Sequence, residues 1–212
     1  MNLPAIIFDF GNVVGFFDYV RACEAIALPR GLDGPALLRN ARERGLNELV
    51  ARLEIGQLPA EAFVSSCCSL LELDALTPDE FRDAWSDIFW PNESLVPLIR
   101  RLSDAGHPLI LGSNTNGLHA SRFRGQFADT LAAFDRLILS YEIGHLKPSM
   151  GFYRACVEAA GADPAHCIFI DDLPENVEGA RRAGLHGLCY RDTPTLEADL
   201  LRLGVAAAAR ES

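Results

Sequence analysis

The stretch Pro4-Ala5-Ile6-Ile7-Phe8-Asp9-Phe10 is an apolar run that carries one carboxylate near its end. Its β-branched and aromatic residues favour a strand that is buried on both faces of a sheet. Comparable runs recur along the chain, at Pro108–Gly112, Leu137–Leu139, Cys167–Ile170 and Gly187–Tyr190. These runs predict the strands of one sheet.

Helical patterns lie between the later runs, at Ser94–Ala105, Leu118–Phe127, Met150–Ala160, Glu175–Ala183 and Leu196–Leu203. Turn signals such as Gly161-Ala162-Asp163-Pro164 mark the joints. Strand and helix in alternation predict an α/β fold with a doubly wound parallel sheet. We expect the alanine-rich tail after Gly204 to be a frayed end.

One stretch, from about Phe16 to Pro91, departs from this alternation and shows amphipathic helical patterning without a convincing strand. Within it, Thr77 precedes Pro78 and has Glu80 at capping-box spacing, which indicates a helix start. The stretch is too long for a simple crossover. We therefore predict an all-helical cap at residues 16–91, inserted after the first strand, and a core formed by residues 1–15 and 92–212.

The composition excludes some classes of function. A formal net charge of −10 argues against broad electrostatic binding to nucleic acid or to an anionic membrane. The six cysteines show no CxxC pair and no metal-type spacing, so we expect reduced thiols in a cytoplasmic protein. We identify no signal-like segment and no apolar run long enough to span a bilayer. The sequence does not indicate the oligomeric state.

Four polar clusters follow the predicted strands: Asp9, Ser113–Asn116, Lys147 and Asp171-Asp172. The carboxyl ends of parallel strands meet at one edge of an open sheet, where functional groups collect. Each cluster alone has an ordinary explanation as a cap, a turn or a solvated carboxylate, but the four in order predict one shared site. Lys147 is the single lysine in a chain with 18 arginines. Lysine offers a compact point charge rather than a planar fork, which suggests a site-specific role.

These residue types suit phosphoryl transfer through a covalent aspartyl-phosphate. A carboxylate can act as the nucleophile when a divalent cation holds it and shields the approaching phosphate. We predict that Asp9 is this nucleophile and a metal ligand, that Asp172 is the opposing ligand, and that Asp171 is either a direct ligand or a support behind the ligands. Such hard oxygen ligands suit Mg²⁺. Without the cation, the three carboxylates would raise one another's pKa.

The remaining polar residues are predicted to hold the phosphate. Ser113 and the backbone amide of Asn114 would bind phosphate oxygens near a helix start, where backbone donors point outward. Lys147 would contact both the nucleophile and the transferring phosphoryl group, as a catalytic and a phosphate-binding residue. The loss of one such stabilising group costs on the order of 10²–10³ in rate.

The order Asp9, Ser113-Asn114, Lys147-Pro148, Asp171-Asp172 resembles the four motifs of the haloacid dehalogenase superfamily over essentially the whole chain. Residues 16–91 stand where that family has its helical cap. Three segments resemble the subgroup that contains bacterial α-D-glucose-1-phosphate phosphatase: Phe8-Asp9-Phe10-Gly11-Asn12-Val13-Val14, Ser113-Asn114-Thr115-Asn116 and Leu53-Glu54-Ile55-Gly56-Gln57. The resemblance implies a Rossmann-like, Mg²⁺-dependent phosphatase whose cap closes over a small phosphorylated metabolite, such as a hexose 1-phosphate.

The chain departs from the family pattern at Gly11. Most phosphatases of this family have a second aspartate two residues after the nucleophile, as general acid and base, whereas Gly11 offers a metal only its backbone carbonyl. A sugar 1-phosphate eases this problem, because an anomeric hydroxyl is a better leaving group than a simple alcohol. Asp18 is a candidate for the missing proton donor; its alternative role is the N-cap of a helix that begins at Tyr19. His119 and His145 lie near the motifs, and we expect each to be structural or exposed to solvent.

Two other functions remain open from the sequence. Family dehalogenases also use an aspartate nucleophile and a lysine, without a metal, but they typically lack the paired aspartates seen at Asp171-Asp172. A catalytically impaired member that binds a phosphorylated ligand or a partner is favoured by Gly11. The joint presence of Asp9, Lys147 and Asp172 argues against it. The sequence does not predict which of four cap side chains faces the site: Arg39, Arg42, Glu43 or Glu54.

Overall fold

The computed structural model describes residues 3–73 and 75–208, and its centre is a parallel sheet in the strand order β5-β4-β1-β6-β7. These strands are β1 (Ala5–Phe8), β4 (Leu109–Ser113), β5 (Arg136–Leu139), β6 (Cys167–Asp171) and β7 (His186–Cys189). Every neighbouring pair in this sheet is parallel. The predicted α/β fold with a doubly wound sheet is confirmed.

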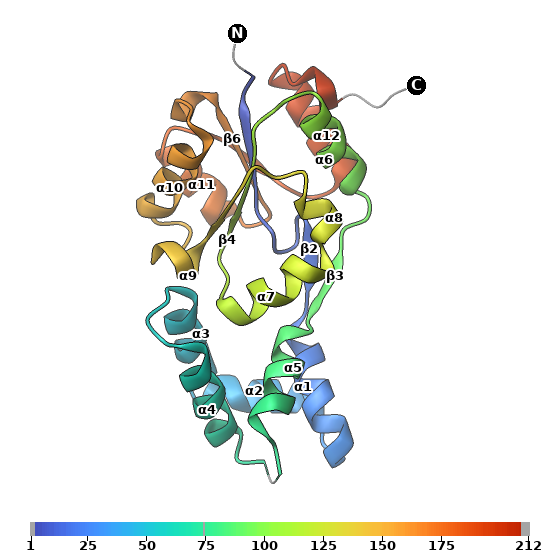
Figure 1. The fold of residues 1–212 in the computed structure, drawn as a ribbon, viewed down its shortest axis with the longest axis vertical. Coiled ribbons are helices and arrows are strands. Elements are labelled where there is room, and N and C mark those ends of the chain that lie inside the picture. Colours follow the sequence, from blue (N-terminus) through green and yellow to red (C-terminus); the bar gives the residue numbers. More distant parts are fainter. Residues whose placement is uncertain (1–2, 74, 209–212) are drawn as a thin grey trace.

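Helices cover both faces of this sheet (Figure 1). They are α6 (Val96–Asp104), α7 (Gly117–Gln126), α8 (Ala128–Leu131), α9 (Ser140–Ile143), α10 (Met150–Ala160), α11 (Pro174–Arg182) and α12 (Thr193–Arg202). Alternate residues of β1 enter different apolar clusters, since Ile6 and Phe8 pack with α6 and α12 while Ala5 and Ile7 pack with α10 and α11. Burial on both faces explains why the strand is a continuous apolar run.

Five further helices form a cluster beyond the carboxyl edge of the sheet (Figure 1). They are α1 (Tyr19–Ala27), α2 (Gly34–Glu43), α3 (Leu46–Glu54), α4 (Ala60–Leu71) and α5 (Pro78–Ser86). They pack around their own apolar core, which includes Phe63, Phe81 and Trp85. Thr77 and Glu80 form the expected capping box at the start of α5. We call these helices the cap; its boundaries at residues 16 and 91 stay a prediction.

The expectation of no strand between Phe16 and Pro91 is wrong. The chain leaves the core through β2 (Gly15–Phe17) and returns through β3 (Phe89–Pro91), and the two strands pair in antiparallel fashion. Each strand has three residues, which is too short for an alternating pattern to be visible. The pairing brings together segments far apart in the sequence, so local propensity does not reveal it.

The chain after Gly204 also differs from the frayed end that the sequence suggests. Ala206–Ala208 form a short 3₁₀ turn, and Val205 and Ala208 are fully buried against the apolar cluster on the α6 and α12 side of the sheet. Small alanine side chains pack closely here because they need little space. The last four residues lie outside the described part of the chain. None of the helices in that part combines the length and hydropathy that a bilayer crossing requires.

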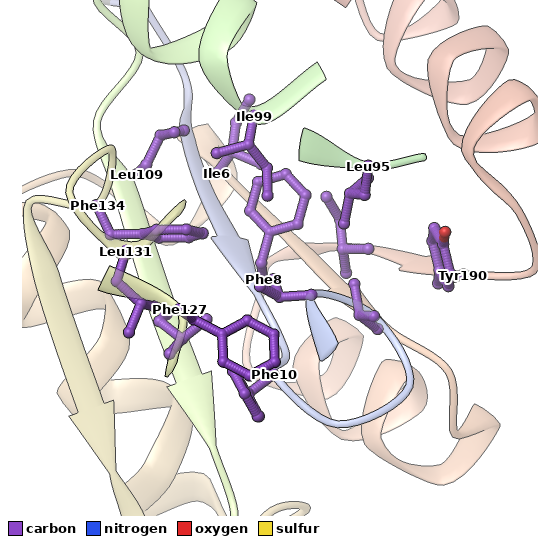
Figure 2. Close-up of a cluster of buried hydrophobic side chains, with 14 of the residues drawn as sticks. Ile6, Phe8, Phe10, Leu95, Ile99, Leu109, Phe127, Leu131, Phe134 and Tyr190 are labelled. Carbon is purple, nitrogen blue, oxygen red and sulfur yellow. The ribbon is translucent and has the colours of Figure 1, made fainter. Parts of the chain in front are cut away.

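Phe10 connects the sheet to the strands that lead into the cap. It belongs to the apolar cluster drawn in Figure 2, on the same side of β1 as Phe8. Its ring stacks on Phe123 with centroids 4.3 Å apart and meets Phe127 and Phe89 edge-on at 5.0 and 5.4 Å. Asp9 is therefore followed directly by a side chain that fixes the position of the loop after β1.

We expect Phe10→Ala to lower the free energy of unfolding by about 3–5 kcal/mol, because it removes a buried aromatic ring from a packed cluster. Denaturant unfolding of wild type and variant measures this loss. Leu28→Ala is the matched control, since its side chain is 69% exposed and a surface change of this kind stays within about 0.5 kcal/mol. Equal, small effects of the two substitutions would contradict the packing role of Phe10.

Candidate active site

The sheet brings the predicted acidic residues to one edge. Asp9 directly follows β1, and its backbone amide donates to the carbonyl of Ile170 in β6 at 2.8 Å. Asp171 is the last residue of β6, and Asp172 comes next. Asp9 and Asp171 are 6% and 0% exposed, so their carboxyl groups lie in a largely water-free environment. Adjacent strands thus position both carboxylates at their carboxyl ends, as the sequence predicts.

Lys147 lies between these two carboxylates. Its Nζ is 2.6 Å from Asp9 Oδ1 and donates a 2.8 Å hydrogen bond to Asp171 Oδ2. Burial alone would lower the pKa of Lys147, but the charges of Asp9 and Asp171 outweigh this effect and raise it. The ammonium group therefore stays protonated, although the Lys147 side chain is only 2% exposed to solvent.

Asp9 has a pKa raised to about 7, chiefly because the carboxyl group is buried. The negative charges of Asp171 and Asp172 raise the pKa further, while Lys147 lowers it. Burial likewise raises the pKa of Asp172. The three side chains offer carboxylate oxygens within 4.8 Å of one another. Such a cluster strongly favours a positive charge at its centre.

The oxygens of these carboxylates differ in what they already bind. Asp9 Oδ1 accepts from the Phe10 amide at 2.7 Å and contacts Lys147, whereas no described residue donates to Asp9 Oδ2. Asp171 is saturated, since Oδ1 accepts from the Leu173 amide and both oxygens accept from Asn176 Nδ2 at 2.9 and 3.1 Å. The hard oxygen donors of Asp9 and Asp172 fit a Mg²⁺ ion, while Asp171 holds Lys147.

Asn176 is a site residue that the sequence did not indicate. It lies in the first turns of α11, is 4% exposed and bonds both oxygens of Asp171. Tyr153 in α10 donates to its backbone carbonyl at 2.7 Å. The only local signal is its position five residues after Asp171, which places it on the helix that follows the strand.

The loop after β4 holds Lys147 in place. The Asn114 side chain forms a reciprocal pair of bonds with the Lys147 backbone: the Lys147 amide donates to Asn114 Oδ1 at 2.8 Å, and Asn114 Nδ2 donates to the Lys147 carbonyl at 3.2 Å. Ser140 Oγ bonds both the amide and the carbonyl of Thr115 at 2.9 Å. Ser113 is 3% exposed and its hydroxyl makes only a long 3.4 Å bond to the next carbonyl, so it remains available to a ligand.

Gly11 has no room for a larger side chain as the loop stands. A Cβ at this position would lie 2.9 Å from the Phe17 ring, so that Phe17 of β2 occupies the space into which a side chain would extend. The next residue, Asn12, adopts a left-handed conformation with φ of 57° and donates from Nδ2 to Asp172 Oδ2 at 3.1 Å. The loop after Asp9 thereby reaches across to the second acidic motif.

A cavity of about 290 Å³ opens above these groups, between the sheet and the cap. Its lining combines Asp9, Ser113, Lys147 and Asp172 with Tyr19 and Glu54 of the cap. Among the four cap residues considered from sequence, Glu54 lines this cavity and Arg39, Arg42 and Glu43 do not. A wider, open hollow of about 1430 Å³ between α1, α5 and α7 contains none of the acidic motifs.

The structure does not bring Asp18 into the cavity. Asp18 is exposed and accepts from the Val20 amide at 2.8 Å as the N-cap of α1, which is the structural role considered for it. His145 is exposed. His119 is buried, bonds the carbonyl of Trp85 and has its pKa lowered to about 4 by burial, so it is neutral. His119 is thus an uncharged residue in the cavity lining.

Comparisons with known proteins point to one family. The model of haloacid dehalogenase-like hydrolases matches residues 4–184. Phosphatase MT3486 of Mycobacterium tuberculosis is 30% identical over 87% of this chain and 86% of its own length. D-ribitol-5-phosphate phosphatase of Bacteroides thetaiotaomicron is 28% identical over 84% of this chain and 87% of its own.

Solved structures share the fold. A haloacid dehalogenase-family enzyme of Bacteroides thetaiotaomicron, in complex with magnesium and inorganic phosphate, has a TM-score of 0.73 at 22% identity over 90% of this chain and 95% of its own. L-2-haloacid dehalogenase of Xanthobacter autotrophicus has a TM-score of 0.65 at 18% identity over 96% of this chain and 84% of its own. At these identities the likeness concerns the fold.

The raised pKa of Asp9 makes the metal-free site costly at neutral pH. Because the folded protein holds the Asp9 proton more tightly than the unfolded chain does, the free energy of unfolding is highest below the unfolded pKa and falls as pH rises through the folded pKa of about 7. Above that pH the ionised Asp9 side chain destabilises the fold, and an uncharged amide at this position avoids the loss. We therefore expect Asp9→Asn to raise the melting temperature of the metal-free protein, slightly at pH 4 and by about 5 °C or more at pH 8, where each kcal/mol corresponds to about 2–4 °C.

Thermal unfolding in EDTA between pH 4 and pH 8 measures this difference. Asp104→Asn is the control, because it makes the same exchange at an exposed residue at the end of α6, outside the acidic cluster of Asp9, Asp171 and Asp172. A variant less stable than wild type at pH 8 would show that the Lys147–Asp9 ion pair outweighs the cost of burial.

Proposed function

The chain belongs to the haloacid dehalogenase-like hydrolases, and we propose that it is a phosphatase that hydrolyses a small phosphorylated metabolite, with Mg²⁺, through an aspartyl-phosphate on Asp9. The observation that carries this proposal is the buried contact of Lys147 with both Asp9 and Asp171, beside Asp172. Relatives named as phosphatases over most of the chain support the phosphatase activity.

The donor set fits the metal. Asp9 Oδ2, Asp172 and the backbone carbonyl of Gly11 would hold Mg²⁺, and the bound ion would neutralise the charge between the carboxylates and the phosphate. The magnesium and phosphate found in the structurally similar Bacteroides enzyme support this choice of ion. Asp171 is proposed to support the site by holding Lys147, because its oxygens are already bonded.

Asp9 has the position of a nucleophile. Its Oδ1 is held by the Phe10 amide and by Lys147, which fixes the direction of the carboxylate in the cavity. Lys147 would also neutralise charge on the transferring phosphoryl group, and Ser113 Oγ with the Asn114 amide would bind its oxygens. Transfer of the phosphoryl group to Asp9 releases the alcohol, and water then hydrolyses the aspartyl-phosphate.

The cavity volume and lining limit the substrate. A space of about 290 Å³ with a polar floor and aromatic walls from Phe17, Tyr19 and Phe89 suits a small metabolite rather than a polymer. We propose a sugar phosphate, such as a hexose 1-phosphate, because an anomeric hydroxyl leaves more readily than a simple alcohol. The alternative of metal-free dehalogenation is disfavoured by Asp172, a carboxylate that faces the nucleophile and gains from a cation.

We expect phosphate release from a panel of sugar phosphates to require Mg²⁺ and to fall below detection in Asp9→Asn, because the variant lacks the nucleophile. Lys147→Met should lower kcat by at least about 10² through loss of a charge aimed at the transition state. A phosphate-release assay with and without EDTA measures these effects, and halide release from L-2-chloropropionate without metal is the parallel assay.

Halide release without phosphate release would support the dehalogenase instead. Mg²⁺ that raises the melting temperature without any phosphate release would support an impaired, ligand-binding member of the family.

A further inference from the structure

We propose that Glu54 of the cap gives the leaving-group oxygen its proton when the phosphoryl group passes to Asp9, and later takes a proton from the water that hydrolyses the phosphoenzyme. Glu54 is the last residue of α3 and lines the same cavity as Asp9, Lys147 and Asp172. This role rests on the phosphatase function proposed above and supplies the acid and base that Gly11 lacks.

The nucleophile loop carries no acid at the position of Gly11. Phe17 fills the space beside Gly11, at 2.9 Å from where a Cβ would lie. Asp18 is exposed and committed to the N-cap of α1. His119 is neutral, with its ring nitrogens directed to Trp85 and Asn116. The proton donor must therefore come from another wall of the cavity, and Glu54 is the carboxyl group on the cap side.

A specific contact brings Glu54 to this position. Two residues later, Gly56 adopts a left-handed conformation with φ of 71°, and a Cβ there would lie 2.5 Å from the backbone carbonyl oxygen of Tyr141. Tyr141 lies in α9, which follows β5 at the carboxyl edge of the sheet, and Figure 1 shows α3 next to α9. The end of α3 thus rests directly on the core, so that Glu54 is held over the site.

The surroundings keep Glu54 partly protonated near neutral pH. Burial raises its pKa to about 7, and the charge of Lys147 acts in the opposite direction. The other titratable groups that line the cavity are Asp9, Asp172, Tyr19 and His119. Burial and the nearby Glu54 raise the pKa of Tyr19, which makes Tyr19 a poorer acid than a free phenol. Glu54 is thus close to the pKa that general acid and base catalysis favours.

The two half-reactions balance with Glu54 in this role. In the first, an oxygen of Asp9 bonds to phosphorus, the bond from phosphorus to the alcohol oxygen breaks with its electron pair on oxygen, and Glu54 protonates that oxygen. In the second, the water oxygen bonds to phosphorus, the aspartyl oxygen departs with its pair, and the Glu54 carboxylate takes the water proton. Asp9 and protonated Glu54 are restored, with one water consumed and one phosphate released.

The test compares leaving groups in Glu54→Gln, with Mg²⁺ present. We expect kcat/KM for an alkyl phosphate, a hexose 6-phosphate, to fall by about 10²–10⁴, the usual contribution of a general acid. For p-nitrophenyl phosphate, whose leaving group needs no proton, kcat/KM should change by less than about tenfold. Since the base for the second step is also missing, rapid mixing should show a burst of nitrophenolate close to one per enzyme. Glu48 is an exposed residue of the same helix, and Glu48→Gln should leave kcat/KM unchanged for both substrates.

The outcomes separate this role from the proposed function. Equal losses for both phosphates, or no loss for either, would overturn the role of Glu54 and leave the phosphatase standing. A wild-type enzyme that hydrolyses no phosphate with Mg²⁺ would overturn both. Thermal unfolding of Glu54→Gln with and without Mg²⁺ verifies that the variant is folded and still binds the metal.

Gly56→Ala tests how Glu54 is positioned. The new Cβ would clash with the Tyr141 carbonyl and strain the left-handed backbone, so the end of α3 must move away from the core. We expect kcat/KM for hexose 6-phosphate, divided by kcat/KM for p-nitrophenyl phosphate, to fall at least about tenfold. This is the same selective loss that Glu54→Gln should show. Gly45→Ala is the control, because it also has a positive φ in the cap but a Cβ there meets nothing within 4 Å. An unchanged ratio in Gly56→Ala would contradict positioning through this contact.

Discussion

The buried ammonium of Lys147, held between Asp9 and Asp171, is the interaction on which the rest of the site depends. Removing a lysine and two aspartates from water is costly, and a buried ion pair with one partner missing is more costly still. The fold meets this cost with hydrogen bonds from several elements: Asn114 holds the Lys147 backbone, and Asn176 holds both oxygens of Asp171. The three carboxylates of Asp9, Asp171 and Asp172 outnumber the single ammonium group, so the cluster attracts a further positive charge, which the proposed Mg²⁺ would supply.

The cap completes a site that the sheet leaves open on one side. The short pair of β2 and β3 carries the chain out to the cap and back, and Phe17 of β2 takes the space beside Gly11. The close approach of Gly56 to the backbone carbonyl of Tyr141 brings the end of α3 to the cavity that contains Asp9. In the proposed mechanism the general acid and base, Glu54, thus lies on the cap rather than on the nucleophile loop. Its action therefore depends on contact between the cap and the core.

The sequence predicts those parts of the fold that local patterns encode. Continuous apolar runs identify the strands, and the strand ends place Asp9, Ser113 and Asp171 at one edge, since this follows from parallel pairing alone. It does not predict β2 and β3, which have too few residues for a pattern and pair across the whole cap. The burial of Ala208 is missed for a different reason, because alanine carries little signal for burial. Glu54 is not distinguished from Glu43, because facing the cavity depends on tertiary contacts of Gly56.

The measurement that tests the central claim most directly is the identification of the covalent intermediate. Wild-type protein is mixed with Mg²⁺ and p-nitrophenyl phosphate, quenched in acid within milliseconds, digested and examined by mass spectrometry. One alkali-labile phosphoryl group on Asp9, absent when Mg²⁺ is withheld and absent from Asp9→Asn, is the result we predict. Steady phosphate release with the label on another residue, or with no phosphoenzyme and an active Asp9→Asn variant, would contradict the assignment of Asp9 as nucleophile.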